Sequence, residues 1–176
     1  MDTITVGGPP GSGTSTVCRM LKEELGIEYV YAGQIFRDRA KELGLTLSEF
    51  GELCEKDRSY DNELDERMLL KAREGNVLLE GRMIGPLCKL RNIPSFRIYL
   101  DADSSVRARR VMERDGGDLG TVIIEMEERE ESEAQRYIEY YGVDPRDSSW
   151  YDLILDSTSM TPEEELRSII ENIGER

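Results

Sequence analysis

The chain of 176 residues has no histidine, only three cysteines and no long apolar run. Without histidine, neither a Ser-His-Asp nor a Cys-His nucleophilic scheme is possible, so any proton transfer falls to carboxylates, water or the substrate. The cysteines are far apart and form no CxxC pair, which argues against a zinc site and predicts buried thiols in a reducing compartment. Because no apolar run approaches the length of a membrane span, we expect a cytoplasmic protein.

Positive charge is also scarce, since 23 Lys and Arg residues stand against 37 Asp and Glu residues and give a net charge of −14. Such a surface repels a nucleic-acid backbone and an anionic membrane, so we expect neither a polynucleotide nor a membrane as a partner. Small phosphate ligands stay possible where arginines gather locally. The length is that of one ordinary domain, and we expect residues 1–176 to form a single monomeric domain.

Five short apolar runs alternate with longer segments of helical periodicity. The runs are Thr3–Gly8, Ile27–Ala32, Asn76–Gly81, Phe96–Ala102 and Tyr151–Ser157. This alternation predicts an α/β fold with a parallel sheet covered by helices on both faces. Between the second and third runs, residues 37–74 are polar and mostly helical in pattern and longer than a plain crossover needs, so they could form a small substrate-binding insertion.

A glycine-rich segment follows the first run and leads into a helix expected around Val17–Leu25. It reads Gly8-Pro9-Pro10-Gly11-Ser12-Gly13-Thr14-Ser15-Thr16. Glycines let the backbone N–H groups point inward, and the helix adds its positive dipole end, so the segment predicts a cradle for a polyphosphate. Ser15 or Thr16 could offer a hydroxyl to Mg²⁺ or to a phosphate oxygen. Thr14 stands where such a loop normally has its phosphate-binding lysine.

Arginines recur just beyond the expected strand ends, where ligands of α/β folds bind. Arg37 lies one turn into the helix after the second run, and Arg82 follows the third run, which ends in Glu80. Arg110 and Arg114 are four residues apart on the helix after the fourth run and so share a face. Guanidinium groups suit phosphoryl transfer because they donate several directed hydrogen bonds to phosphate oxygens.

A second charged stripe follows further along the chain, where Arg129, Glu133 and Arg136 are spaced four and three residues apart. We expect two other arginines, Arg107 and Arg109, to lie at the surface. For any one of these arginines, a solvated pair with a glutamate is the simple alternative in so acidic a chain.

The order of these motifs resembles the nucleoside monophosphate kinase family and, more narrowly, archaeal-type cytidylate kinases. The motifs are the loop of residues 8–16, Ala32-Gly33-Gln34-Ile35-Phe36-Arg37, Glu80-Gly81-Arg82, the Arg110/Arg114 pair and the stripe of residues 129–136. In that narrower group the loop also reads Gly-Ser-Gly-Thr, so Thr14 fits the pattern. Residues 129–137, 141–144 and 150–153 are similar to the same family, and the resemblance covers nearly the whole chain.

The resemblance implies a P-loop fold with a five-stranded parallel sheet, a nucleotide-monophosphate-binding insertion near residues 37–74 and a short lid near residues 115–142. It implies that the donor is ATP with Mg²⁺, bound by residues 8–16 and Arg114. Ser15 is the possible metal ligand, and whether Glu80 also helps to bind the metal is left open. The acceptor, CMP or dCMP, would be held by Gly33, Arg37, Gly81, Arg82 and Glu133. The implied catalytic arginines are Arg82, Arg110, Arg129 and Arg136.

The residues themselves do not specify the acceptor base. Bacterial cytidylate kinases follow the arginine after the third strand with an aspartate that faces cytosine, and here that position is Met83. Candidates for base recognition therefore lie in the insertion: Asp57, Arg58, Asp61 and Asp65. Three alternatives stay open, namely a kinase of the same fold acting on UMP or AMP, a non-catalytic nucleotide-binding protein, and a P-loop ATPase or switch protein.

Overall fold

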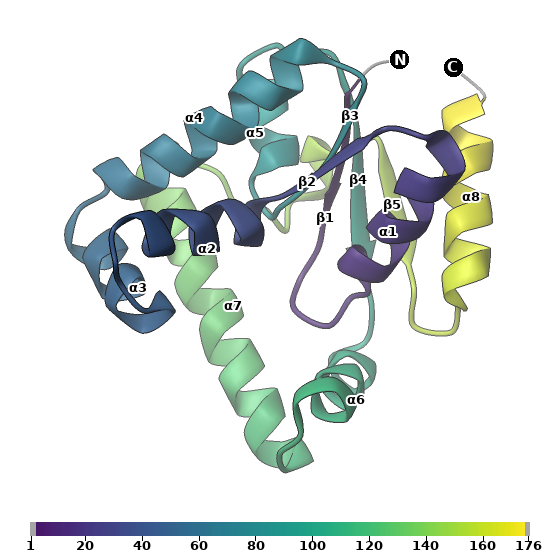
Figure 1. Cartoon of the computed structure of the whole chain (residues 1–176). Coiled ribbons are helices and arrows are strands. Elements are labelled where there is room, and N and C mark those ends of the chain that lie inside the picture. The colour runs from purple at the N-terminus through teal and green to yellow at the C-terminus, as the bar shows by residue number, and fades with distance from the viewer. Residues whose placement is uncertain (1–2, 175–176) are drawn as a thin grey trace.

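The computed structural model describes residues 3–174, in which five parallel strands form one sheet (Figure 1). The strands are β1 (Thr3–Gly7), β2 (Glu28–Tyr31), β3 (Val77–Glu80), β4 (Ser95–Asp101) and β5 (Leu153–Asp156). Their spatial order is β2-β3-β1-β4-β5, and every neighbouring pair is parallel. Each strand coincides with one of the five apolar runs to within one or two residues, so the predicted parallel α/β sheet is confirmed.

Helices cover both faces of this sheet. They are α1 (Thr14–Leu25), α2 (Ala32–Glu42), α3 (Leu47–Lys56), α4 (Ser59–Glu74), α5 (Ile84–Leu90), α6 (Ser104–Asp115), α7 (Leu119–Tyr141) and α8 (Pro162–Gly174). Figure 1 shows α1 and α8 on one side of the sheet and α4 and α5 on the other. A short 3₁₀ turn, Ser148–Trp150, precedes β5.

The alternation of side chains along β3 shows why its sequence is apolar throughout. Leu78 packs into the cluster that α1 and α8 form with the sheet. Val77 and Leu79 point the other way, into the cluster that contains residues of α4 and α5. A strand buried on both faces has no polar side, so the run carries no period-two pattern. The three cysteines are free thiols buried in these clusters and in the insertion, as expected.

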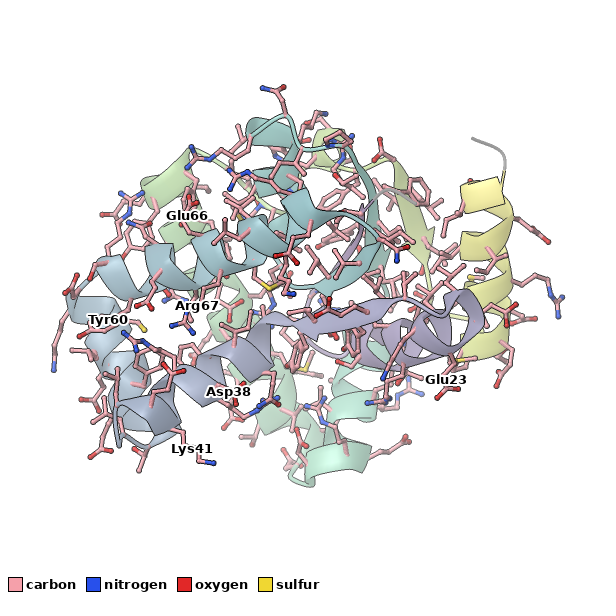
Figure 2. All side chains as sticks on the ribbon, turned by 45° about the horizontal axis from the view of Figure 1, so that its top comes forward. Glu23, Asp38, Lys41, Tyr60, Glu66 and Arg67 are labelled. Carbon is pink, nitrogen blue, oxygen red and sulfur yellow. The ribbon has the colours of Figure 1, made fainter. Side chains whose placement is uncertain are left out.

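Three helices, α2, α3 and α4, fill the insertion between β2 and β3 and have a small core of their own. Phe50 and Cys54 of α3 are buried in it with Ala40 of α2. The guanidinium of Arg67 on α4 lies 2.8 Å from the Glu63 carboxylate and 3.7 Å from that of Glu42 on α2. Figure 2 shows Arg67 between α4 and α2. Ion pairs therefore join the two outer helices of the insertion on their more exposed side.

The longest helix, α7, occupies most of the segment expected to be a lid. It has 23 residues, and its first turns pack against α6 through Val122, Met126 and Ala108. Its last turns reach α4, where the Tyr141 hydroxyl donates to Asn62 and to Asp65. Figure 1 shows this course from α6 to the insertion. Within residues 3–174, no helix is both long and apolar enough to cross a membrane.

Candidate active site

The glycine-rich loop curls between β1 and α1, and close backbone contacts explain its composition. A Cβ on Gly8 would lie 2.3 Å from the Leu100 carbonyl oxygen. Gly11 has a φ of 79°, and a Cβ there would lie 2.5 Å from the carbonyl oxygen of Arg107. Larger residues are therefore excluded at both positions. Since α1 begins at Thr14, its first unpaired N–H groups face the loop and complete an anion cradle.

An arginine holds the loop from behind. One guanidinium nitrogen of Arg110 donates to the carbonyl oxygens of Gly11 and Ser12 and to the Ser157 hydroxyl, and the other donates to the Ser157 carbonyl oxygen at 2.8 Å. The loop carbonyls are thereby occupied, which leaves the N–H groups directed toward the cradle. Arg110 thus supports the loop through its carbonyl groups, and the catalytic part that the resemblance implied for Arg110 stays a prediction.

Arg107 corrects an expectation, because it is buried and not at the surface. Only 8% of the residue is exposed. Its Nε donates to the Ala102 carbonyl oxygen, and a terminal nitrogen donates to the Pro10 carbonyl oxygen and to Glu130 on α7. It therefore ties the start of α6 to the loop and to the lid segment. Arg109 is exposed, as expected.

Glu80, the last residue of β3, gathers hydroxyl groups beneath the first turn of α1. One carboxylate oxygen accepts from Thr14 Oγ1 at 2.9 Å and from Ser15 Oγ at 2.7 Å. The other accepts from the Tyr29 hydroxyl, and burial together with this bond raises the pKa of Tyr29. Thr14 therefore bonds the start of α1 to Glu80, whereas the lysine that is usual at this position of the loop would extend toward the bound phosphates.

The two hydroxyls that follow Thr14 face in different directions. Ser15 faces the Glu80 carboxylate, whereas Thr16 is exposed and accepts from Arg19 at 3.5 Å. Ser15 with Glu80 offers hard oxygen atoms of the kind that Mg²⁺ prefers. Within the described residues, no group of three or more acidic or cysteine side chains could hold a metal ion by itself. A Mg²⁺ ion bound by Ser15 or Glu80 would complete its octahedral coordination with water or phosphate oxygens.

Arg82 stands directly after β3 and forms an ion pair with Glu133 of α7. Glu133 also accepts from Arg129 Nε at 2.9 Å, so one buried carboxylate holds two guanidinium groups. Burial lowers the pKa of Arg82, and the positive charge of Arg129 lowers it further. Two cations held this close are destabilising unless anions balance them, so the cluster has capacity for a phosphate beyond Glu133.

A small cavity brings this cluster and the loop together. Its lining includes Gly8, Pro9, Pro10, Arg82, Glu133 and Tyr137. Tyr99, Glu130 and Arg146 also line it, and the sequence interpretation selected none of the three. Tyr137 could have been found from its place four residues after Glu133 on the same helix face. The cavity therefore lies between the anion cradle and the arginine cluster.

Several expected site residues lie elsewhere. The guanidinium of Arg114 forms an ion pair with Asp115 at 2.6 Å, and its side chain is 68% exposed, so the structure does not bring it to the loop. Arg37 is exposed and stacks over the Tyr31 ring, 5.3 Å from the centroid. Gly33 lies against that same ring, and Gly81 packs beside Ala32. None of these four is among the described residues that line the cavity.

Arg136 points toward the insertion, with a guanidinium nitrogen 3.9 Å from the Asp61 carboxylate. Burial raises the pKa of Asp61, against the opposing effect of Arg136. One turn further along α4, burial raises the pKa of Asp65 to about 6, although the bond from Tyr141 opposes this shift. The start of α4 and the end of α7 thus form a second charged cluster, on the insertion side.

A buried carboxylate near the loop was missed in the sequence. Glu165, in the first turn of α8, is 2% exposed, and burial raises its pKa to about 7 despite the nearby Arg110. The sequence contained a signal, because Glu165 lies four residues before the fully buried Ile169 and so shares its face. A capping box begins this helix, since the Thr161 N–H donates to Glu164 and the Glu164 N–H donates to the Thr161 hydroxyl.

Comparisons with known proteins agree with this geometry. Residues 3–159 match the sequence model of the cytidylate kinase-like family. A cytidylate kinase of Methanopyrus kandleri is 45% identical over 174 residues, covering 95% of this chain and 90% of the relative. A cytidylate kinase of Pyrococcus furiosus is 44% identical over 160 residues, covering 91% of this chain and 82% of the relative.

Among solved structures, a shikimate kinase from Bacteroides thetaiotaomicron superimposes with a TM-score of 0.65 at 17% identity, covering 98% of both chains. That likeness shows a shared kinase fold and nothing about the acceptor. The sequence matches reach further, because they cover almost the whole chain at well above 30% identity. From its loop, its arginine cluster and these matches, the chain belongs to the cytidylate kinase-like family.

Proposed function

We propose that this protein transfers the γ-phosphoryl group of ATP to CMP or dCMP, giving ADP and the nucleoside diphosphate. The observation that carries the proposal is the cavity shared by the glycine-rich loop and the Arg82–Glu133 pair. One wall binds a polyphosphate through backbone N–H groups, and the other presents guanidinium groups to a second phosphate. The relatives from Methanopyrus and Pyrococcus, both cytidylate kinases, support the choice of acceptor.

At the donor end, residues 8–16 hold the ATP phosphates and Arg110 keeps the loop in shape from behind. Ser15, oriented by Glu80, is the protein ligand for Mg²⁺ in this proposal. The ion would neutralise charge on the transferring phosphate oxygens. Arg114 would reach the donor only if its ion pair with Asp115 opened, so its part in ATP binding stays a prediction.

At the acceptor end, Arg82 binds the monophosphate, with Arg37, Gly33 and Gly81 on the side of α2. An acceptor phosphate oxygen attacks the γ-phosphorus in line, a new P–O bond forms, and the bond to the bridging β-phosphate oxygen breaks to release ADP. The attacking phosphate is already ionised near neutral pH, which fits a chain without histidine. No protein nucleophile and no general base take part.

The segment 115–142 supplies two further arginines. Arg129 already lies beside Arg82 through the shared Glu133, so a small movement of α7 would place it between the donor and acceptor phosphates. Arg136 faces Asp61 instead, so the expected contact of Arg136 with the phosphates stays a prediction that this pairing does not favour. Closure of this segment with the insertion would exclude water and so limit wasteful hydrolysis of ATP.

The test is a comparison of initial rates for CMP, dCMP, UMP and AMP with ATP and Mg²⁺, with ATP hydrolysis in the absence of acceptor as the control. We expect CMP or dCMP to be phosphorylated with the highest kcat/KM. A preference for UMP or AMP would make this a kinase of the same fold with another acceptor. Binding of ATP without transfer to any of the four would establish the non-catalytic alternative.

A further inference from the structure

The insertion offers four charged side chains that could recognise a base, and two of them, Asp57 and Arg58, are held by contacts at the start of α4 and the end of α7. The Asp57 carboxylate accepts from the Ser59 N–H at the start of α4. Arg58 lies over the rings of Tyr140 and Tyr141 and donates to the Tyr140 carbonyl oxygen. The remaining two are the carboxylates of Asp61 and Asp65, on adjacent turns of α4.

Asp65 is the more buried of these two carboxylates and accepts from the Tyr141 hydroxyl. This hydrogen bond joins α4 to the last turn of α7. The Asp65 carboxylate therefore serves to hold the two helices together. Asp61 differs. Its side chain is 26% exposed, and within residues 3–174 its carboxylate accepts no hydrogen bond.

Arg136, which pairs with Asp61, also has a hydrogen-bond donor that is not used. The two charges are 3.9 Å apart, which is an ion pair and too long for a hydrogen bond. In the described part of the chain, the Arg136 Nε is buried without a hydrogen-bond acceptor. A partly desolvated carboxylate without donors and a buried guanidinium nitrogen without an acceptor are both unfavourable unless a further polar group satisfies them.

The pair lies at a suitable distance from the phosphate-binding arginines. Arg129 and Arg136 are seven residues apart on α7, which is about 10 Å along the helix at a rise of 1.5 Å per residue. Tyr137 lies between the two groups, and the charged side chains that act on its hydroxyl come from both: Arg82, Asp65, Arg136 and Asp61. A nucleotide with its phosphate at Arg82 would have its base toward α4.

We propose that Asp61 is the residue that distinguishes cytosine from uracil, by accepting a hydrogen bond from the exocyclic amino group while Arg136 beside it donates to the adjacent ring acceptor. This inference rests on the proposed function. Cytosine presents a donor at N4 next to an acceptor at N3, which matches a carboxylate next to a guanidinium. Uracil presents the reverse order, so its O4 would face the carboxylate and its N3–H the guanidinium. Met83, buried after Arg82, then needs no polar role.

The decisive variant is Asp61→Asn, which keeps the size of the side chain and adds a donor able to bond the O4 of uracil. We expect kcat/KM for CMP to fall by about 10²-fold while kcat/KM for UMP is unchanged or rises. Adenine shares the amino–acceptor edge of cytosine, so any residual rate with AMP should fall together with that for CMP. Equal losses for CMP and UMP would overturn the proposal, because Asp61 would then serve only to hold Arg136.

Glu66→Gln is the matched control, since it also replaces a carboxylate of α4 by an amide. Glu66, labelled in Figure 2, is exposed, and its oxygen lies 3.5 Å from Arg91. We expect it to leave the ratio of the CMP and UMP rates unchanged. A fall in that ratio in Glu66→Gln equal to the fall in Asp61→Asn would also overturn the assignment.

A substrate analogue tests the same contact without any substitution. The nucleoside monophosphate of pyrimidin-2-one keeps N3 and O2 but lacks the exocyclic amine. The unaltered protein should use it about 10²-fold less efficiently than CMP, whereas Asp61→Asn should treat the two nearly alike. Equal use of CMP and the analogue by the unaltered protein would refute the contact. Failure of the unaltered protein to phosphorylate CMP at all would instead refute the proposed function.

Discussion

The donor and acceptor ends of the cavity are built in different ways. At the donor end, nine consecutive residues and the helix they begin supply the contacts, and most of these come from the backbone. At the acceptor end, charged side chains from the segment after β3, from α4 and from α7 meet across parts of the chain that are far apart in the sequence. The loop is therefore shaped by local geometry, whereas the acceptor end depends on how three elements pack.

This difference has a consequence for what each end tolerates. The close contacts at Gly8 and Gly11 leave no space for a side chain, so substitutions there should distort the loop. The acceptor end is joined by ion pairs such as Arg82 with Glu133, which can exchange for bonds to a phosphate. Substitutions at the acceptor end should accordingly affect turnover more than folding, and substitutions near the loop should affect both.

The largest effect is expected for Arg82→Ala. It removes the guanidinium that we propose binds the acceptor phosphate, and we expect kcat to fall by about 10³-fold, because a single arginine at a transferring phosphate contributes on that scale. The loss should appear in steady-state rates with CMP while the far-ultraviolet circular dichroism and the affinity for ATP stay close to those of the unaltered protein.

Arg91→Ala is the control for that substitution. The Arg91 side chain is 53% exposed and pairs with Glu66 at 3.5 Å, so its removal should cost little stability and leave turnover unchanged. If Arg82→Ala retained more than a tenth of the normal kcat, Arg82 could not be the main acceptor-phosphate contact. The contrast between the two ends would then lose its main support.

A smaller effect is expected at the donor end for Glu80→Gln. The amide would offer N–H donors to hydroxyls that now donate to a carboxylate, so Ser15 would lose its orientation. We expect a fall of about 10- to 100-fold in activity, partly recovered at high Mg²⁺ concentration. The measurement is kcat and KM for ATP across a Mg²⁺ series.

Tyr29→Phe is the matched control at the same carboxylate. It removes one hydroxyl donor to Glu80 but keeps the charge and the contacts from Thr14 and Ser15. The free energy of unfolding should fall by about 1 kcal/mol, with the Mg²⁺ dependence unchanged. A Glu80→Gln protein with normal kcat at every Mg²⁺ concentration would contradict the proposed part of Glu80 in organising the metal site.

The same contrast between the two ends explains how much the sequence could predict. The five strands and the glycine-rich loop were predictable because apolar runs and loop glycines are local signals. The same loop pattern offered Ser15 or Thr16 as the hydroxyl for a metal ion, and Ser15 as a metal ligand stays a prediction.

Contacts between distant segments could not be read in this way. Arg107 was expected at the surface because a run of arginines on an acidic chain usually is, yet it is buried where α6 meets the loop. Arg114 was expected beside the loop because it lies four residues after Arg110 on the same helix face. It forms an ion pair with the adjacent Asp115 instead. The pairing of Asp61 with Arg136 joins residues 75 positions apart, and no periodicity links them.

The smallest expected effect concerns Glu165, the buried carboxylate behind the loop. Its pKa is raised to about 7 from an ordinary value of 4.5, so between these values the folded state binds more protons than the unfolded state. The stability of the protein should therefore decrease as the pH rises through this window. Glu165→Gln removes the penalty of ionisation, so the difference in Tm between variant and unaltered protein should increase by several degrees from pH 4.5 to pH 8. The measurement is thermal unfolding at intervals across that range.

A difference independent of pH would mean that Glu165 is ionised at the same pH in the folded and unfolded chains, and that Arg110 fully offsets its burial.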